Sequence, residues 1–300
     1  MKHDKPASFK PANTTILNVD RDEELMKYLL ISLKGKSRNN IKSLLSHQQI
    51  LVNKQQISQF NHHLKAGDQI TISNQRTQEL PRASKQFSII FEDEHLIIVD
   101  KQAGILSMGT QGEREHTVYF QLSQHVKQQN RANKIFIVHR LDRETSGVMV
   151  FAKSQKVKQL LQENWNQVLA ERSYIAVVEG VFEKEHGSIR SYLHENKSMK
   201  VYSGQKAKDG KLAITHFKVI KRSSTHTLIE LHLETGRKNQ IRVHMQDAGH
   251  SIINDKKYGA QTNPIGRLGL HARVLSIKHP LTGKLLRFQT PIPPSFLKLF

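Results

Sequence analysis

The sequence predicts an α+β fold, in which a mixed, largely antiparallel sheet with flanking helices follows a small N-terminal α/β module. Three observations support this prediction. Strand-like and helical patterns beyond residue 87 are interspersed and do not alternate regularly. Two helical patterns and short strand runs are crowded into about sixty residues near the N-terminus. A polar stretch that contains Pro81 separates the two regions.

The N-terminal module is predicted over residues 13–75. Apolar residues over 23–33 fall at helical spacing, and Ser37 is placed to cap a second helix. Residues 50–52 form an apolar strand run, and residues 69–73 alternate with the period of a half-buried strand. Residues 1–12 lack periodicity and are expected to be a mobile arm, and residues 76–86 are expected to be a linker.

The larger domain is predicted over residues 87–300. It begins with a hairpin over 88–91 and 95–100, followed by a helix over 117–128. Strands are predicted over 135–139 and 148–152, and Ser154 is placed to cap a helix that includes Trp165 on its apolar face. The remaining strand-like runs are 174–181, 214–220, 226–233, 240–244 and 273–279.

The charge of the chain indicates a polyanionic partner. The 300 residues include 46 Lys and Arg against 26 Asp and Glu, a formal net charge of +20. Residues 1–86 hold 14 basic and 7 acidic residues, a net of +7, and residues 87–300 hold 32 and 19, a net of +13. Both predicted domains are therefore basic, so the charge is not confined to a tail.

Several classes of protein are excluded by composition. The chain has no cysteine, which excludes disulfides, thiolate zinc sites and cysteine nucleophiles. The longest apolar runs are five residues, whereas a membrane-spanning helix needs about 20. The basic start lacks the apolar stretch of a secretory signal, and the 17 histidines show no HExxH spacing. We therefore expect a cytoplasmic protein with no membrane contact and no metal.

The segment His139–Gly147, HRLDRETSG, is the strongest candidate for a functional site. An apolar strand run precedes it and another follows it, so polar residues are presented at the end of a rigid scaffold. Asp142 lies between Arg140 and Arg143, and cationic neighbours favour the ionised form of a carboxylate. Such a carboxylate can act as a nucleophile or base beside phosphate groups. The alternative from these residues alone is a salt-bridged turn.

This nonapeptide resembles the signature of the RluA-type pseudouridine synthases, which isomerise uridine in ribosomal and transfer RNA. Four further segments resemble motifs of that family in the same order, and residues 23–73, with Ser37-Arg38, resemble its S4-type RNA-binding module. The four segments are Arg172–Ala176 with Gly180, Lys211–Thr215, Leu233–His244, and a closing set of Asn254-Asp255, Tyr258-Gly259, Leu270–Ala272 and His279-Pro280.

The resemblance implies roles for particular residues. Asp142 matches the catalytic aspartate, Tyr174 the tyrosine that stacks on the target base, and Arg242 the basic partner of the aspartate. Arg140 matches the arginine that fills the space of the flipped nucleotide. Further RNA contacts are expected from Arg143, Ser37, Arg38, Arg237 and Lys238. Isomerisation involves no redox change and no external group, so no cofactor is expected.

The sequence departs from the family pattern at three places. Gln102 stands where the family has a proline after Lys101, and Lys238-Asn239 replaces the usual Thr/Ser-His pair. The S4-like part lacks the usual glycine within 47–50. The first change loosens a turn without removing a chemical group. The second alters contacts at the rim of the expected site and therefore bears on RNA specificity.

The expected activity is isomerisation of specific uridines in structured RNA by a monomeric enzyme. The S4-like module favours large-subunit ribosomal RNA, because long structured RNA rewards a second binding surface, while transfer RNA remains an alternative substrate. A non-catalytic RNA-binding or ribosome-assembly factor on the same fold is a second alternative, and a metal-dependent nuclease is a third. Retention of Asp142, Tyr174 and Arg242 together favours the enzyme.

Overall fold

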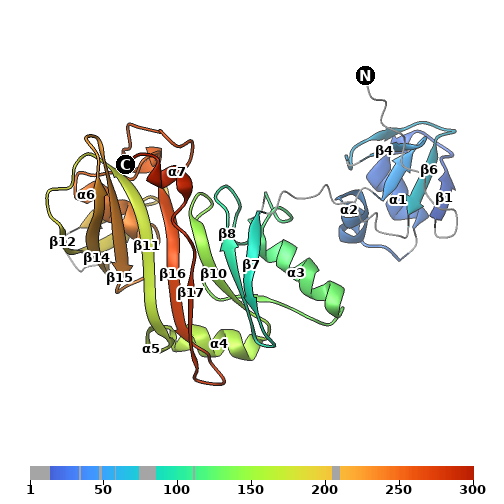
Figure 1. Ribbon diagram of the computed structural model, residues 1–300. Helices are drawn as coiled ribbons and strands as arrows, with labels where there is room; N and C mark the ends of the chain where they lie inside the picture. The colour runs from blue at the N-terminus through green and yellow to red at the C-terminus, as the bar shows by residue number, and fades with distance from the viewer. Residues whose placement is uncertain are drawn as a thin grey trace. The chain divides into compact units, whose positions relative to one another are not determined.

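The computed structural model divides the chain into two compact units, Met1–Ser84 and Lys85–Phe300 (Figure 1). The structure describes residues 14–33, 35–46, 49–57, 59–73, 86–110, 112–204 and 210–300. The predicted arm over 1–12 and the predicted linker, except for its last residue, lie outside the described residues.

The N-terminal unit packs two helices against a small sheet. Helix α1 begins at Leu25, directly after Glu23 and Glu24, which pair with Leu64 and His63 as a two-stranded ladder. The Asn40 N–H donates to Ser37 Oγ at 3.3 Å, so Ser37 caps the second helix as predicted. The elements are α1 Leu25–Ser32, α2 Arg38–Ser46, the sheet β1 Thr14–Asn18, β6 Gln69–Ser73, β3 Ile50–Val52 and β4 Gln55–Gln56, and the ladder β2 Glu23–Glu24 with β5 His63–Leu64.

The second unit is organised around one large sheet. Its main path runs β13-β12-β14-β15-β11-β16-β10-β8-β7, with β17 paired to β16 and β9 paired to β10. Only the β10–β16 pair is parallel among the described strands, so the predicted mixed, largely antiparallel α+β fold is confirmed. The strands are β7 Phe87–Glu92, β8 Leu96–Lys101, β9 Phe136–Ile137, β10 Ser146–Ala152, β11 Leu169–Glu179, β12 His186–Glu195, β13 Val201–Gly204, β14 Lys211–Arg222, β15 His226–Leu233, β16 Leu270–Lys278 and β17 Leu285–Gln289.

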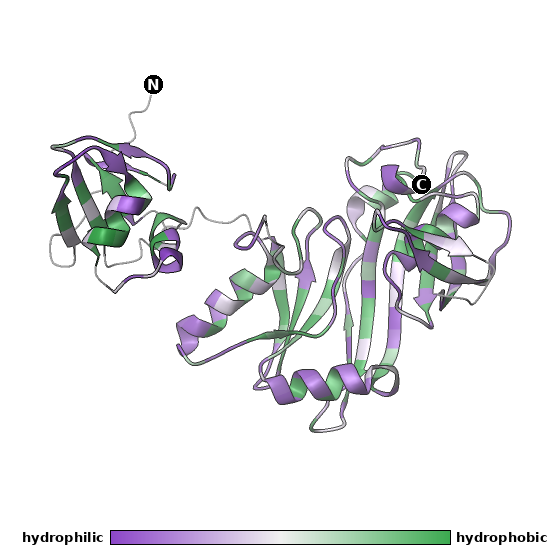
Figure 2. Ribbon diagram, turned by 180° about the vertical axis from the view of Figure 1, so that it is seen from behind, coloured by the Kyte–Doolittle hydropathy of each residue, from purple (hydrophilic) through white to green (hydrophobic). Residues whose placement is uncertain are grey.

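Both faces of this sheet are covered by apolar side chains. Successive residues of a strand point to opposite faces, and in β8 Ile97 and Val99 belong to one core cluster while Leu96 and Ile98 belong to another. Helix α3, Val118–Gln129, packs into the first cluster, and helix α4, Gln155–Glu163, packs into the second. Figure 2 shows the strands as the most hydrophobic part of this unit. The remaining helices are α5 Trp165–Val168, α6 Gln240–Asp247, the 3-10 turn η2 Lys256–Tyr258 and α7 Pro294–Leu297.

The strand predicted over 240–244 is wrong, because this segment is the start of helix α6. Polar and apolar residues alternate over this segment, a pattern that is typical of a strand. In the structure the polar Gln240 and His244 are buried, four residues apart on one side of the helix, and both hydrogen-bond Thr215. The alternation was misleading because its polar members face inward.

The strand predicted over 135–139 is shorter than expected. Only Phe136 and Ile137 pair with β10. Beyond them the His139 side chain replaces the backbone ladder, since its Nε2 accepts the Val150 N–H at 3.2 Å. The helix that Ser154 caps ends at Glu163, and the short helix α5 follows after Asn164. Within the part of the chain that the structure describes, no helix combines the length and apolar character needed to span a membrane.

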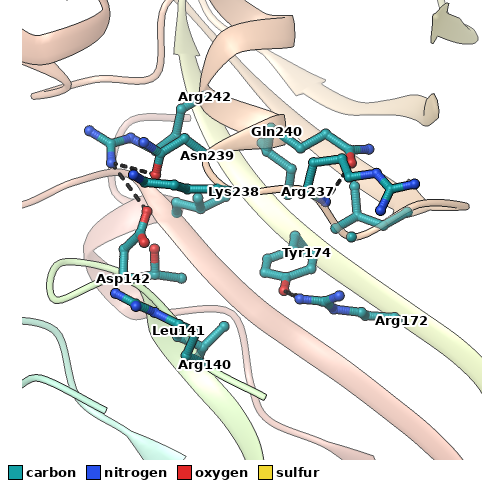
Figure 3. A pocket seen from close by; sticks show the side chains of 15 residues that line it. Arg140, Leu141, Asp142, Arg172, Tyr174, Arg237, Lys238, Asn239, Gln240 and Arg242 are labelled. Atoms are coloured by element: carbon teal, nitrogen blue, oxygen red, sulfur yellow. Dashed lines mark hydrogen bonds and ion pairs between the residues drawn. The ribbon is translucent and has the colours of Figure 1, made fainter. Parts of the chain in front are cut away.

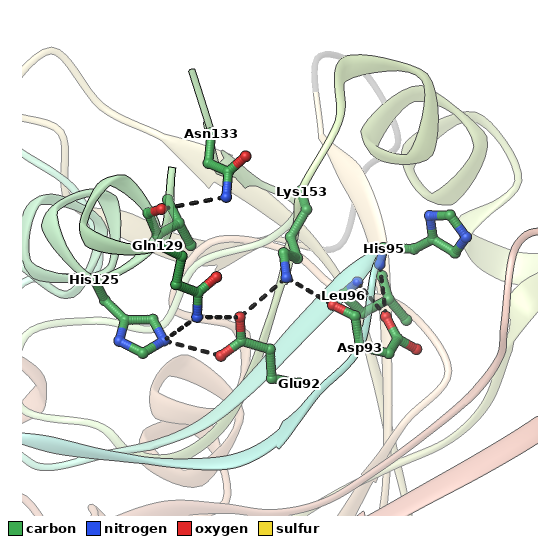
Figure 4. A network of polar contacts seen from close by, with 9 residues as sticks. Glu92, Asp93, His95, Leu96, His125, Gln129, Asn133 and Lys153 are labelled. Atoms are coloured by element: carbon green, nitrogen blue, oxygen red, sulfur yellow. Dashed lines mark hydrogen bonds and ion pairs between the residues drawn. The ribbon is translucent and has the colours of Figure 1, made fainter. Parts of the chain in front are cut away.

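A polar network holds α3 to the edge of the sheet (Figure 4). Glu92, at the end of β7, accepts from Lys153 Nζ at 3.0 Å and contacts His125 Nε2 of α3 at 2.9 Å. Lys153 Nζ also donates to the Asp93 carbonyl at 2.7 Å. Burial opposes ionisation of Glu92, but the hydrogen bonds from His125 and Lys153 outweigh it and lower its pKa.

We predict that Glu92→Gln lowers the free energy of unfolding by about 1 kcal/mol at neutral pH. The folded-state pKa of Glu92 lies below the value of an unfolded chain, about 4.3, so its stabilisation is complete above that pH and is lost as the pH falls through the folded value. Urea unfolding at pH 7 and at pH 3.5 measures the difference. Glu94→Gln is the control, because the Glu94 side chain is 89% exposed, and an equal effect of both variants at pH 7 would contradict the role of the network.

Candidate active site

A cavity of about 320 Å³ opens where four segments of the second unit meet (Figure 3). These are the turn 139–145 before β10, the strand β11, the start of β16, and the segment that leads from the end of β15 into α6. The lining comprises Arg140, Leu141, Asp142, Thr145, Arg172, Tyr174, Leu233, Gly236, Arg237, Lys238, Asn239, Gln240, Ile241, Arg242 and Leu270. Three of its members, Asp142, Tyr174 and Arg242, are the predicted catalytic residues.

The turn that carries Asp142 is fixed from within. Leu141 donates its N–H to Ser107 Oγ at 3.1 Å, and Ser107 Oγ donates to the Leu141 carbonyl at 2.7 Å. Burial, with the nearby charge of Arg172, lowers the pKa of His139 to about 3, so its ring is neutral at physiological pH. Because Nε2 accepts the Val150 N–H, the proton of this neutral ring is assigned to Nδ1. His139 therefore acts as a structural anchor of the turn.

Lys101 stabilises the same turn from the protein interior. Its side chain is fully buried, and Nζ donates to the carbonyls of Gln102 at 3.0 Å, Ile105 at 2.8 Å and Arg143 at 3.0 Å. Burial lowers the pKa of Lys101 to about 7. A buried amine with three carbonyl partners ties the end of β8 to the residue that follows Asp142.

Arg242 contacts two carboxylates at once. Its Nε and Nη2 each lie 2.7 Å from an oxygen of Asp255, and its Nη1 lies 3.1 Å from Asp142 Oδ2. The Asp255 side chain is 1% exposed, that of Arg242 15%, and that of Asp142 33%. Burial opposes the charge on Arg242, but Asp255 and Asp142 together raise its pKa. The guanidinium is thus anchored on a buried acid and presents its free edge to the accessible one.

Tyr174 lies in the wall of the cavity and is 4% exposed. Its hydroxyl oxygen accepts from Arg172 Nε at 3.0 Å and from Nη2 at 2.7 Å, and the guanidinium carbon lies 5.4 Å from the ring centroid. Two N–H donors of one guanidinium on the hydroxyl oxygen would stabilise negative charge that develops there. The Tyr174 ring itself offers an apolar surface for a planar ligand.

The loop before α6 is held by Gln240, which is 2% exposed. Its amide nitrogen donates to the Ile214 carbonyl and to Thr215 Oγ1, and its amide oxygen accepts from Thr235 Oγ1 and the Arg237 N–H. Asn239, which precedes Gln240, has a left-handed backbone conformation with φ of 54°. Its side chain donates to Tyr258 Oη at 3.0 Å and lies 3.4 Å from Arg242 Nη1.

The structure brings most predicted site residues together, with differences in detail. Arg140, Arg237 and Lys238 line the cavity, and Lys238 Nζ pairs with Glu195. Arg237 Nε donates to the Leu212 carbonyl at 3.0 Å. The predicted RNA-binding residues Ser37 and Arg38 belong to the N-terminal unit and are not among the lining residues.

One electrostatic inference from the sequence is wrong. The spacing of the turn suggested that Arg140 and Arg143 surround Asp142. In the structure Arg143 Nη2 pairs with Glu113 at 2.7 Å, and the cation in contact with Asp142 is Arg242. In this turn, neighbouring side chains point in different directions. Residues that are adjacent in the sequence therefore do not form the ion pair with Asp142.

Sequence reasoning missed three residues that support the site. Asp255 and Arg172 stood in the recognised motifs, but nothing in their spacing indicated that they contact Arg242 and Tyr174. Lys101 was noted only for the missing proline after it. The charge of Lys101 is the sequence feature that could have indicated its role. A lysine at the end of an apolar strand run is buried only where its amine has polar partners. Among the residues that the structure describes, no group of three or more His, Asp or Glu side chains could hold a metal ion.

Comparison with known proteins identifies the family. The model of the RNA pseudouridylate synthase family matches residues 95–247, which include the turn with Asp142 and the helix with Arg242. The chain belongs to the RNA pseudouridylate synthase family. The RluA-type family predicted from the motifs is therefore confirmed, and the protein is an RNA-modifying isomerase whose substrate is RNA.

Individual relatives extend over nearly the whole chain. An RNA pseudouridine synthase of Bacillus subtilis strain 168, YhcT, is 31% identical over 289 residues and covers 95% of each chain. The ribosomal large subunit pseudouridine synthase D of Neisseria meningitidis serogroup B is 33% identical over 273 residues, 86% of this chain and 72% of the relative. The solved structure of human RNA pseudouridylate synthase domain containing 4 has a TM-score of 0.58 at 24% identity, over 70% of this chain and 90% of the human one. That structure shares the fold.

We predict that Lys101→Met lowers the free energy of unfolding by about 3 kcal/mol, because three buried carbonyls lose their donor. Urea unfolding of the purified full chain measures the change. Lys156→Met, at an exposed position of α4, is the control and should have little effect. Equal stability of the two variants would show that Lys101 does not hold the turn.

Proposed function

We propose that this synthase isomerises specific uridines of large-subunit ribosomal RNA, with Asp142, Tyr174 and Arg242 as its catalytic residues. The observation that carries the proposal is the ion pair between Asp142 and Arg242 at 3.1 Å, at the mouth of a cavity whose wall includes Tyr174. The carboxylate is one-third exposed, so it is accessible to a ligand while its partner is nearly buried.

The choice of ribosomal RNA is supported by the relatives and by charge. The Neisseria relative is named for the large ribosomal subunit and aligns with 86% of this chain. Residues 1–86 carry a net charge of +7 in addition to the +13 of residues 87–300. A second basic unit adds phosphate contacts, and a long structured RNA offers phosphates to both. We propose that residues 13–75 serve as this S4-like RNA-binding domain.

The target uridine has to leave the RNA stack before its glycosidic bond can be reached. Extrusion of a base costs a few kcal/mol, and part of that cost is offset when another group fills the vacancy. Arg140 is exposed at the rim of the cavity and makes no hydrogen bond or ion pair with any residue that the structure describes. Its planar guanidinium is free to stack in the space left by the uridine.

The reaction exchanges one bond of the ribose for another. Asp142 attacks the ribose or removes a proton from it, and the bond between C1′ and N1 of uracil breaks. The base turns, C5 bonds to C1′, and the C5 proton leaves while N1 gains a proton. The product has the atoms of the substrate, and the Asp142 carboxylate is regenerated.

Arg242 assists Asp142 in this reaction, and Tyr174 assists at the uracil ring. Arg242 donates to Asp142 and fixes the direction of its carboxylate, because the position of Arg242 is itself set by Asp255. Tyr174 provides a surface for the uracil ring, and its hydroxyl can give its proton to N1 and, as the phenolate, then take the C5 proton. Arg172 donates twice to that hydroxyl and would stabilise the phenolate.

We predict that Asp142→Asn slows isomerisation by about 10⁴-fold or more while RNA binding is retained. Tritium release from a large-subunit ribosomal RNA transcript labelled with [5-³H]uridine measures the loss of the C5 proton. Glu144→Gln is the control, since it removes the same charge from an exposed position of the same turn that does not line the cavity. Wild-type rates for Asp142→Asn would show that the catalytic assignment is wrong.

The RNA target is tested in cells that lack the protein. Pseudouridine mapping across all RNA should show sites lost from large-subunit ribosomal RNA and restored by the wild-type gene but not by Asp142→Asn. Loss confined to transfer RNA would contradict the proposed substrate.

A further inference from the structure

A second crevice lies on the same unit, outside the cavity that contains Asp142. It has a volume of about 670 Å³ and lies between the loop that begins at Met108, the start of α3, the strand β9 and helix α4. Tyr119, Phe120 and Phe136 are among its lining residues. Met108 is 41% exposed and Tyr119 39% exposed, so large apolar side chains are open to solvent there. Three aromatic rings in one accessible crevice indicate a ligand with a flat apolar surface.

The charges at this crevice indicate an anionic ligand. Arg114 and Lys158 line it from two different elements, the loop and α4, and the lining that the structure describes contains no acidic side chain. Lys158 is half-buried and Arg114 is exposed. A ligand that combines a flat aromatic ring with negative charge matches this lining, and a nucleotide of an RNA strand has both.

The crevice is connected to the active-site turn through the loop. Ser107, which hydrogen-bonds both backbone groups of Leu141, immediately precedes Met108. Further along, Glu113 pairs with Arg143 of the turn. The loop that forms one wall of the crevice is thus fastened at two points to the residues on either side of Asp142.

The strand β9 provides a second connection. Ile137, in the crevice lining, is three residues from Arg140, so their Cα atoms are separated by no more than about 11 Å. An RNA chain that places its target uridine in the active-site cavity therefore passes within a few nucleotides of the crevice. Extrusion of the uridine also removes a stacking partner from its neighbours, which makes a nearby base available for stacking elsewhere.

We infer that this crevice is a second nucleotide site, in which an unstacked base of the RNA substrate lies against Tyr119 and Phe136 while Arg114 and Lys158 contact its phosphates. This inference rests on the proposed isomerisation of RNA. The site binds RNA without taking part in the chemistry, so it contributes to affinity and to the choice of uridine.

The test measures RNA binding without turnover. Each variant is made in the full chain with Asp142→Asn, and its Kd is determined for the ribosomal RNA transcript that the wild-type protein modifies. Tyr119→Ala is expected to raise the Kd about 5-fold to 150-fold, the effect of losing one base–aromatic stack, and Tyr119→Phe is expected to restore wild-type affinity. Lys158→Ala should reduce the slope of log Kd against log salt by about 0.7 to 0.9.

The control is Lys127→Ala, which removes an exposed charge from the last turn of the same helix α3 outside the crevice lining. Photo-crosslinking of a transcript that contains 4-thiouridine adds a measurement that needs no substitution, and crosslinks are expected on peptides containing Tyr119 or Phe136. An unchanged Kd for Tyr119→Ala, with crosslinks elsewhere, would overturn the inference. A protein partner would then be the alternative ligand of the crevice.

The two proposals fail in different ways. If the wild-type protein releases no tritium from ribosomal RNA, the proposed substrate is wrong. If it releases tritium and Tyr119→Ala binds RNA as tightly as the parent, only the second nucleotide site is wrong.

Discussion

The guanidinium of Arg242, shared between Asp255 and Asp142, is the interaction on which the rest of the site depends. Asp255 is 1% exposed, and a buried carboxylate without a partner would destabilise the fold by several kcal/mol. The fork from Nε and Nη2 satisfies it and thereby fixes the plane of the guanidinium. The third nitrogen of the guanidinium, Nη1, donates to Asp142. A requirement of the folded core thus sets the direction of the accessible carboxylate.

Two other sets of contacts bring the partners of this interaction into place. Helix α6 is oriented by Gln240 and His244, which both hydrogen-bond Thr215 of β14. Burial lowers the pKa of His244 to about 4, so the bond is made by a neutral ring. On the other side, the turn with Asp142 is held by Lys101 and His139. The site is rigid because each half is tied to the sheet independently of the ion pair.

Apolar periodicity, a local property of the sequence, predicts the fold class and most strands, and the resemblance of the motifs to a known family predicts the three central residues. Periodicity and local spacing alone do not show which cation meets Asp142, since Arg242 lies 100 residues away and the nearer Arg143 pairs with Glu113; only the family resemblance points to Arg242. The pattern at Gln240 predicts a strand, but the segment is helical, and its polar residues Gln240 and His244 are buried. Asp255 and Arg172 were overlooked for a related reason, as their roles exist only through contacts made in three dimensions.

The geometry of Arg242, and not its charge alone, makes it effective. A lysine keeps the charge but has no planar fork, so it cannot hold Asp255 and Asp142 together. The most direct measurement is the single-turnover rate of Arg242→Lys on a [5-³H]uridine ribosomal RNA transcript, alongside Arg242→Met. We expect the lysine variant to lose about 100-fold in rate, close to the loss of the methionine variant, with RNA affinity retained. A lysine variant that works at the wild-type rate would contradict this expectation.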